Sequence, residues 1–311
     1  MPDSTVFCYV ADYRIFLSFL SVSDNECNLA AVILKRVIQK NRKYVVYCKQ
    51  EMKDMKRFAI VSRRDKYSLK LEDKANNCLC HLGFIRDDEH PDTVIVIGGD
   101  GTFIHAVHQY MHCLNDVCFF GIHTGTLGFY SDYLDKDIVE FLQVLIEGTG
   151  KEQKFSVLEA ECNDRFYYAI NEIRIENAAR TQVVDVHVDG TYFETFRGTG
   201  MCVCTQLGST AYNRSLGGAV IQEGLDLIEL AEISGIHHSK YRSLDAPIVL
   251  RDSCILDFKS ESFDGALLGC DAEVFSLNDA DHVCISVCSN KKVRVLRGKE
   301  VSYFDRLKSL F

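Results

Sequence analysis

A single carboxylate, Asp100, lies inside the glycine-rich stretch of residues 98–102. The stretch follows an apolar, β-branched run, residues 94–97, and precedes a segment with helical character, residues 103–108. A strand, a glycine turn and a helix start bring backbone N–H groups together, and such groups bind phosphate. A carboxylate repels phosphate, so Asp100 suits another task, either holding a metal or accepting a proton from an attacking hydroxyl. Taken alone, the stretch is equally compatible with a tight turn in which the aspartate caps the helix.

Three further stretches carry side chains suited to a nucleotide ligand. Residues 121–129 follow another apolar run and form a second glycine-rich loop. Asn171 and Glu172, on a predicted strand at residues 167–175, pair an amide with a carboxylate that can bind a ribose or an adenine edge. Residues 208–212 place small residues, hydroxyls and a tyrosine on one turn, which can bind sugar hydroxyls or phosphate. Each stretch by itself is also compatible with an ordinary turn or an exposed polar pair.

Other chemistries are disfavoured by the motifs that the sequence lacks. It contains no GxxxxGK[ST] loop, no protein-kinase motif set and no GxSxG elbow. His105, His108 and His112 lie on one helical stripe, for which we expect a partly exposed face with His105 near phosphate. The cysteines and histidine within residues 78–81 lack the second matching pair that a zinc site needs. Any phosphoryl transfer must therefore use a loop of the 98–102 type.

Composition limits the partners and the compartment. The chain has 311 residues and a net charge of −9, which argues against nucleic acid or an anionic membrane as a partner. No apolar stretch reaches membrane-spanning length, and the N-terminus lacks the basic flank of a secretory signal. The 14 cysteines are scattered without a CxxC pair, which predicts free thiols in a reducing cytoplasm.

The alternation of predicted elements indicates two domains. Strands and helices alternate over residues 55–132, which predicts a doubly wound, Rossmann-like α/β domain with ligand at the strand ends. Residues 133–289 are mostly β, with predicted helices at 137–147 and 225–234 and a hairpin turn at Asp189-Gly190. Residues 1–54 are predicted to be an accessory extension, or upstream coding that is not normally translated.

The order and spacing of these motifs over about residues 56–300 resemble the NAD kinases, and the short bacterial members most closely. Residues 98–102 match the family's GGDGT, residues 121–129 its GxxxGxLGF loop, Asn171-Glu172 its NE pair and residues 208–212 its GSTAY turn. The resemblance implies an α/β domain, a β-sandwich C-terminal domain, and a tail at about residues 290–311 that packs back on the first domain. It also implies a homodimer or homotetramer.

The resemblance further implies transfer of a phosphoryl group to the adenosine 2′-hydroxyl of NAD, giving NADP. ATP would be the donor (polyphosphate in some members), with a divalent metal, Mg²⁺ first. Phosphoryl transfer depends on positioning and charge stabilisation, with one carboxylate to deprotonate the hydroxyl, and Asp100 would be that base. The residues that would line the site are Asp100, Gly101, Phe129, Asn171, Glu172, Arg197, Thr199, Thr210, Ala211, Tyr212, Asn213, Arg214, Ser215, Ser234 and Asp271.

Two positions depart from the family pattern and keep other functions open. Gln206 replaces a proline before the GSTAY turn, which only loosens a turn. Thr199 stands where the family has the aspartate of GDG, and this loss favours a second hypothesis, a catalytically weak NAD- or NADP-binding protein. A lipid kinase of the diacylglycerol-kinase type also shares GGDGT. The NE pair, the GSTAY turn and the lack of a basic membrane-facing segment count against it.

Overall fold

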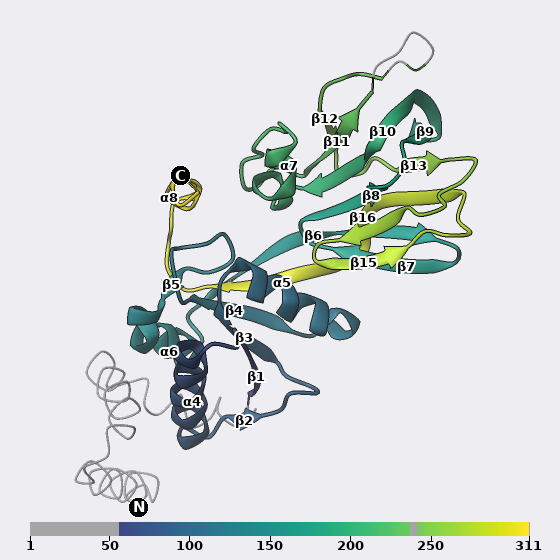
Figure 1. Cartoon of the computed structure of the whole chain (residues 1–311). Coiled ribbons are helices and arrows are strands. Elements are labelled where there is room, and N and C mark those ends of the chain that lie inside the picture. The colour runs from purple at the N-terminus through teal and green to yellow at the C-terminus, as the bar shows by residue number, and fades with distance from the viewer. Residues whose placement is uncertain (1–55, 237–240, 242, 311) are drawn as a thin grey trace, which may run out of the picture. The chain divides into compact units, whose positions relative to one another are not determined.

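The computed structural model describes residues 56–236, 241 and 243–310 (Figure 1). Residues 1–54, predicted to be an extension, lie outside the described residues. The chain divides into two compact units. Among the described residues, unit 1 comprises 56–106, 116–152 and 296–310, and unit 2 comprises 107–115 and the rest of 153–295.

Unit 1 is built on a parallel sheet of buried, apolar strands. The strand order is β2-β1-β3-β4-β5, and each neighbouring pair in it is parallel. A strand buried on both faces has a continuous apolar sequence, which is why these strands were recognisable from their composition. The strands are β1 (Arg57–Ser62), β2 (Ile85–Arg86), β3 (Thr93–Gly98), β4 (Cys118–His123) and β5 (Tyr133–Leu134).

Helices cover both faces of this sheet. Successive strand residues point to opposite faces, and Phe119 and Phe120 of β4 do so. The Phe119 ring lies 5.7 Å from that of Phe103 in helix α5, and the Phe120 ring stacks at 4.0 Å on Phe141 in helix α6. The predicted doubly wound α/β unit is thereby confirmed. The helices are α4 (Lys66–His81), α5 (Asp100–Gln109), α6 (Ile138–Glu147) and α8 (Tyr303–Lys308), with a 3-10 turn at Asp135–Asp137.

Local sequence signals explain where these helices begin and end. The Asp65 side chain accepts hydrogen bonds from two backbone N–H groups in the first turn of α4, as an N-cap does. Leu71 and Leu79, two turns apart on one face of α4, are buried in the core of the unit. Helix α6 ends at Gly148, whose φ of +63° is the left-handed conformation that glycine adopts most readily.

Unit 2 is β-rich, as the sequence predicts. Its strands follow the order β15-β14-β8-β10-β9-β13-β16, with β11 added to β10, β12 added to β11, and β7 paired with β6. The strands are β6 (Lys151–Cys162), β7 (Arg165–Ala169), β8 (Glu172–Glu176), β9 (Gln182–Val188), β10 (Thr191–Thr205), β11 (Leu227–Gly235), β12 (Ile248–Arg251), β13 (Leu256–Lys259), β14 (Leu267–Cys270), β15 (Glu273–Ser276) and β16 (His282–Arg297). Short helical turns occur at Met111–Cys113, Gly208–Thr210 and, as α7, Tyr212–Ser215.

The hairpin predicted at Asp189-Gly190 is confirmed. These residues join β9 to β10, with Val188 paired opposite Thr191. Asp189 has a φ of +50° and Gly190 a φ of +74°. Two successive positive φ values match the twist of antiparallel strands, which is why Asp-Gly is favoured at such turns.

The helix predicted at residues 225–234 is wrong, because this segment forms strand β11 between β10 and β12. Ile228 and Leu230 lie in the core of unit 2, whereas the intervening Glu229 accepts hydrogen bonds from Asn213 and Ala219. This alternation is that of a strand. Leucine, alanine and glutamate favour helices, but pairing with two neighbouring strands outweighs a propensity of a few tenths of a kcal/mol per residue.

Candidate functional site

Asp100 is the first residue of α5, and Gly99 alone separates it from Gly98, the last residue of β3. Its Oδ2 accepts a hydrogen bond from the backbone N–H of Phe129 at 3.1 Å, and its Oδ1 accepts one from Tyr130 at 3.4 Å. The carboxylate thus binds across to the second glycine-rich loop, and these bonds differ from those of a helix cap. The side chain is half-buried and both its oxygens have a fixed orientation, as a proton acceptor requires.

Gly128 allows this close approach of loop and carboxylate, and Gly98 allows a close contact within the first loop. A Cβ atom at Gly128 would lie 2.2 Å from Asp100 Oδ1, and one at Gly98 would lie 2.3 Å from the Thr102 hydroxyl oxygen. Both distances are shorter than any real contact. Gly98 and Gly128 are therefore needed for packing in the structure itself, before any ligand is considered.

His123, which the sequence reasoning passed over, lies beside the same loop. It ends strand β4, and its Nδ1 accepts a hydrogen bond from the Gly125 N–H at 3.0 Å. Burial lowers the pKa of His123, and the charge of Arg63 adds to this against the opposing effect of Asp100. The ring is therefore neutral near pH 7, with its proton on Nε2. Its place at the carboxyl end of a parallel strand was the available signal.

Asp271 organises the Asn171–Glu172 segment of unit 2. Its Oδ1 accepts the N–H groups of Asn171 at 2.8 Å and Glu172 at 3.2 Å, and its Oδ2 accepts that of Ile170 at 2.9 Å. Only 2% of this side chain is exposed. These bonds interrupt the single strand predicted at 167–175, so Asn171 lies in the break between β7 and β8.

His108 differs from its predicted place on a partly exposed stripe. Its side chain is only 9% exposed, with Nε2 2.8 Å from Asp271 Oδ2 and Nδ1 3.3 Å from Glu273 Oε2. Burial by itself lowers the pKa of His108, but the bonds and charges of Asp271 and Glu273 outweigh it, and the pKa is raised. His105 and His112 are exposed. The two acidic partners lie more than 160 residues further along the chain, so helical spacing gave no signal of them.

Glu172 is a buried carboxyl group with one free oxygen. The residue is 6% exposed, and its Oε2 has no hydrogen-bond partner within the described part of the chain. Burial raises the pKa of Glu172 to about 7, the charge of Asp271 adds to this, and Arg174 and the Tyr212 backbone N–H oppose it. Near neutral pH the group can therefore either donate or accept a hydrogen bond from a ligand hydroxyl.

The GSTAY turn packs directly on this segment. A Cβ atom at Gly208 would lie 2.0 Å from the carbonyl oxygen of Asn171, and that oxygen accepts the Thr205 N–H at 2.8 Å. The Arg174 guanidinium lies over the Tyr212 ring, 4.6 Å from its centroid. The structure therefore brings together the NE pair, the turn and Asp271, which the sequence separates by up to 100 residues.

The other residues predicted for this turn differ in how exposed their side chains are. Thr210, Ala211 and Tyr212 are partly exposed, and Arg214 and Ser215 are exposed. Asn213 is fully buried, and its Nδ2 donates to Glu229 at 2.8 Å. Its side chain therefore supports the turn from inside, and the neighbouring residues present the accessible groups.

Arg197, Thr199 and Ser234 form a second group on β10 and β11. The Thr199 carbonyl oxygen accepts bonds from Gln182 Nε2 at 2.7 Å and from the Asn177 N–H at 2.9 Å. Ser234 is exposed with a φ of +49°, and its carbonyl oxygen would lie 2.6 Å from a Cβ at Gly198. The Arg197 guanidinium lies over the Tyr241 ring, 5.4 Å from its centroid.

A separate hollow of about 770 Å³ in unit 2 lies beside this second group. Asn177, Gln182 and Tyr241 line it together with side chains of both charges, such as Lys259 and Asp264. None of the residues predicted for the site lines this hollow. Its mixed charge favours no ligand class.

The described residues show neither a cluster of metal-binding side chains nor a membrane-spanning helix. Across residues 56–310, leaving out the undescribed positions, no group of three or more His, Cys, Asp or Glu side chains is arranged to hold a metal ion. Within the same part of the chain, no helix has the length and apolar character needed to cross a membrane.

The fold and the glycine-rich loop at its strand ends define a nucleotide-binding α/β protein with a second, β-rich unit. Family models described as the ATP-NAD kinase N-terminal domain and C-terminal domain match residues 19–149 and 170–297. The chain therefore belongs to the NAD kinase family, as its motifs indicated.

Individual relatives agree with this assignment over most of the chain. The sequence is 34% identical to NAD kinase 1 of Bacillus anthracis, over 82% of this chain and 98% of that protein. It is 33% identical to the NAD kinase of Latilactobacillus sakei, over 82% of this chain and 97% of that protein. An NAD kinase from Archaeoglobus fulgidus in complex with ATP superposes with a TM-score of 0.66 at 23% sequence identity, over 81% of this chain and 99% of that chain. Yeast NADH kinase complexed with NADH superposes with a TM-score of 0.70 at 17% sequence identity, over 82% of this chain and 86% of that chain. Both structures support the fold.

Proposed function

We propose that this chain transfers the terminal phosphoryl group of ATP to the adenosine 2′-hydroxyl of NAD, giving NADP and ADP. The observation that carries the proposal is the Asp100 carboxylate, held by two backbone N–H groups at the end of β3. It lies in the GGDGT motif of a chain that belongs to the NAD kinase family. The family supports the choice of substrates, and the geometry of Asp100 supports its proposed role as the base.

Asp100 acts as the general base in this proposal. Its carboxylate accepts the proton of the 2′-hydroxyl while the new O–P bond forms and the bond between the β,γ-bridging oxygen and the γ-phosphorus breaks. ADP leaves, and the proton then passes from Asp100 to solvent. The backbone amides of residues 98–102 and the start of α5 supply N–H donors for the phosphate oxygens.

The cluster around Asn171 and Glu172 holds NAD in this proposal. The free Oε2 of Glu172 and the exposed groups of residues 210–215 bind hydroxyls of the dinucleotide. Asp271 acts as a positioning residue, because its two oxygens already accept three backbone N–H groups and His108. Arg197, Thr199 and Ser234 line the same ligand.

A divalent cation, for which Mg²⁺ is the first candidate, would neutralise charge on the ATP phosphates. Mg²⁺ keeps several waters and is usually bound by substrate phosphates and only one or two carboxylates. The described residues form no cage of three metal-binding side chains, which fits an ion carried by ATP. Asp100 lies within the glycine-rich stretch of residues 98–102 that would receive those phosphates.

We further propose a homodimer or homotetramer in the cytoplasm, with residues 1–54 as an accessory extension and the tail from about residue 290 supporting the α/β domain. The eleven cysteines in the described part of the chain are free, as in a reducing compartment. Burial raises the pKa of the Cys78 thiol to about 11, which keeps it protonated and unreactive.

The decisive experiment supplies purified full-length protein with NAD, ATP and Mg²⁺. NADP is detected with a reporter enzyme that is strictly dependent on NADP. Formation of NADP that requires ATP supports the proposal. Binding of NAD without any NADP would favour the alternative, a catalytically weak dinucleotide-binding protein, which Thr199 in place of the family aspartate suggests.

A further inference from the structure

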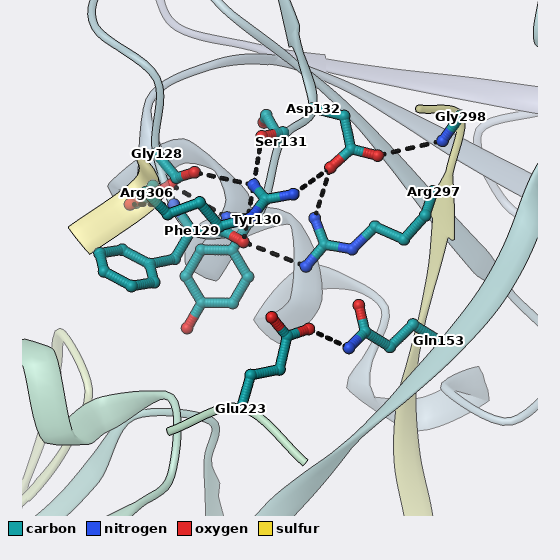
Figure 2. Close-up of polar contacts among 11 residues, drawn as sticks. Gly128, Phe129, Tyr130, Ser131, Asp132, Gln153, Glu223, Arg297, Gly298 and Arg306 are labelled. Carbon is teal, nitrogen blue, oxygen red and sulfur yellow. Dashed lines mark hydrogen bonds and ion pairs between the residues drawn. The ribbon is translucent and has the colours of Figure 1, made fainter. Parts of the chain in front are cut away.

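Arg306 of helix α8 is buried against the second glycine-rich loop (Figure 2). The residue is 3% exposed. Its Nη1 donates to the carbonyl oxygens of Gly128 at 3.0 Å and Ser131 at 2.7 Å, and its Nη2 donates to Asp132 Oδ1. The planar fork of a guanidinium fixes the directions of several acceptors at once, whereas the three donors of an ammonium group rotate freely.

A second arginine completes this clamp, which consists of Arg297, Arg306 and Asp132. Arg297 Nη1 donates to Asp132 Oδ1 at 3.0 Å, and its Nη2 donates to the Phe129 carbonyl oxygen at 3.1 Å. The Gly298 N–H donates to the other oxygen of Asp132 at 3.0 Å. The Asp132 side chain is 1% exposed, so these partners compensate its buried charge.

The two arginines hold the same peptide groups that hold Asp100. Arg306 binds the carbonyl of the Gly128–Phe129 peptide, and the N–H of that peptide donates to Asp100 Oδ2. Arg297 binds the carbonyl of the next peptide, whose N–H, that of Tyr130, donates to Asp100 Oδ1. Each peptide is planar, so a fixed carbonyl direction also fixes the N–H direction. Hydrogen bonds in such a chain also polarise one another.

We propose that Arg306 and Arg297 are positioning residues that orient the Asp100 carboxylate for proton transfer. This inference rests on the proposed function, because it requires Asp100 to be the base. The arginines reach Asp100 through the peptides between residues 128 and 130. Removing either arginine side chain should therefore slow the phosphoryl-transfer step and change NAD binding little.

The test is a double-mutant cycle in the full-length protein with Arg306→Ala, Asp100→Asn and the double variant. Arg306→Ala is expected to lower kcat about 10- to 100-fold with little change in KM for NAD, since small misplacements of a reacting group have effects of this size. Arg306→Lys keeps the charge without the fork and is expected to lie between Arg306→Ala and the parent. In the Asp100→Asn background, Arg306→Ala should cause little further loss.

Lys308→Ala is the matched control, because Lys308 is an exposed residue of the same helix whose ion pair within the described part of the chain is with Asp305. It is expected to leave kcat unchanged. If Arg306→Ala does not fold, Arg306→Lys or Arg297→Gln takes its place in the double-mutant cycle with Asp100→Asn. Losses that multiply in the double variant, or a change confined to KM, overturn the positioning role. Unaltered turnover in Asp100→Asn alone instead overturns the base assignment.

Discussion

The orientation of the Asp100 carboxylate is set by the peptide N–H groups that donate hydrogen bonds to it. Its type and its place among glycines left two interpretations open, a helix cap and a proton acceptor. The bonds to Phe129 and Tyr130 favour the second, because they fix both oxygens on the side of the second loop. At this scale the sequence supplied the residue, and the structure supplied its orientation.

Replacing the base without changing its shape tests this directly. Asp100→Asn is expected to lower kcat by about 10²- to 10⁴-fold, because the amide cannot accept the hydroxyl proton. Equilibrium binding of NAD should largely survive, which calorimetry can measure alongside turnover. Turnover equal to that of the parent would exclude Asp100 as the base.

Thr199 is one of the two positions, with Gln206, at which the sequence is predicted to depart from the family pattern. If the missing carboxylate limits NAD binding, Thr199→Asp should raise kcat/KM for NAD about tenfold, the value of one added hydrogen bond to a charged group. Thr199→Ser is the control, since it keeps a hydroxyl. An unchanged kcat/KM in Thr199→Asp would show that the threonine does not impair the enzyme.

Glu172 is expected to make the stability depend on pH. Its pKa is raised from 4.5 to about 7, so between these values the folded state binds a proton that the unfolded state releases. The contribution of Glu172 to the free energy of unfolding is therefore largest below pH 4.5 and falls as the pH rises through 7. Glu172→Gln has no proton to lose and should be more stable than the parent at pH 8, by about 1–3 kcal/mol.

Chemical denaturation at pH 5 and pH 8 measures this difference. Glu261→Gln serves as the control, because Glu261 is exposed. The gain from Glu172→Gln should shrink toward pH 5. An equal effect at both pH values would contradict the raised pKa.

At the scale of elements, glycine contacts join segments that are distant in sequence. The GSTAY turn can pack on Asn171 only because Gly208 has no side chain. The same principle brings Gly128 against Asp100. These contacts explain why motif glycines matter even where no ligand touches them.

Gly208→Ala is expected to separate the turn from the NE pair. The added methyl would meet a backbone oxygen, which cannot move aside alone, so overpacking should cost about 1–3 kcal/mol of unfolding free energy. NAD affinity should fall as well. Gly101→Ala is the stability control, since a Cβ there meets no atom within 4 Å and alanine favours a helix. Equal stability of Gly208→Ala and the parent would contradict the packing argument.

At the scale of the whole molecule, the two units have separate cores. One core cluster of unit 1 lies between its parallel sheet and helices α4 and α6, and one of unit 2 lies within its antiparallel strands. The family models match one segment in each part of the chain, residues 19–149 and 170–297. The division into an α/β part and a β-rich part thus follows from composition and from contacts alike.

The assembly predicted from the family resemblance can be measured without any variant. Sedimentation analysis of the purified chain at micromolar concentration should give the mass of two or four copies. A mass of one copy across the concentration range would contradict the prediction. The measurement is independent of activity, so a weak enzyme would still be informative.

The sequence by itself determined the family, the two kinds of domain and the identity of Asp100, because these depend on local patterns and motif order. Local propensity failed at residues 225–234, where pairing on both sides makes a strand from helix-forming residues. Only the tertiary structure decided that Asp271 holds the NE pair, that His108 is buried beside it, and that Arg306 supports the loop around Asp100. These contacts join residues 99 to 178 positions apart. No local pattern encodes such partners, because chain folding brings them together.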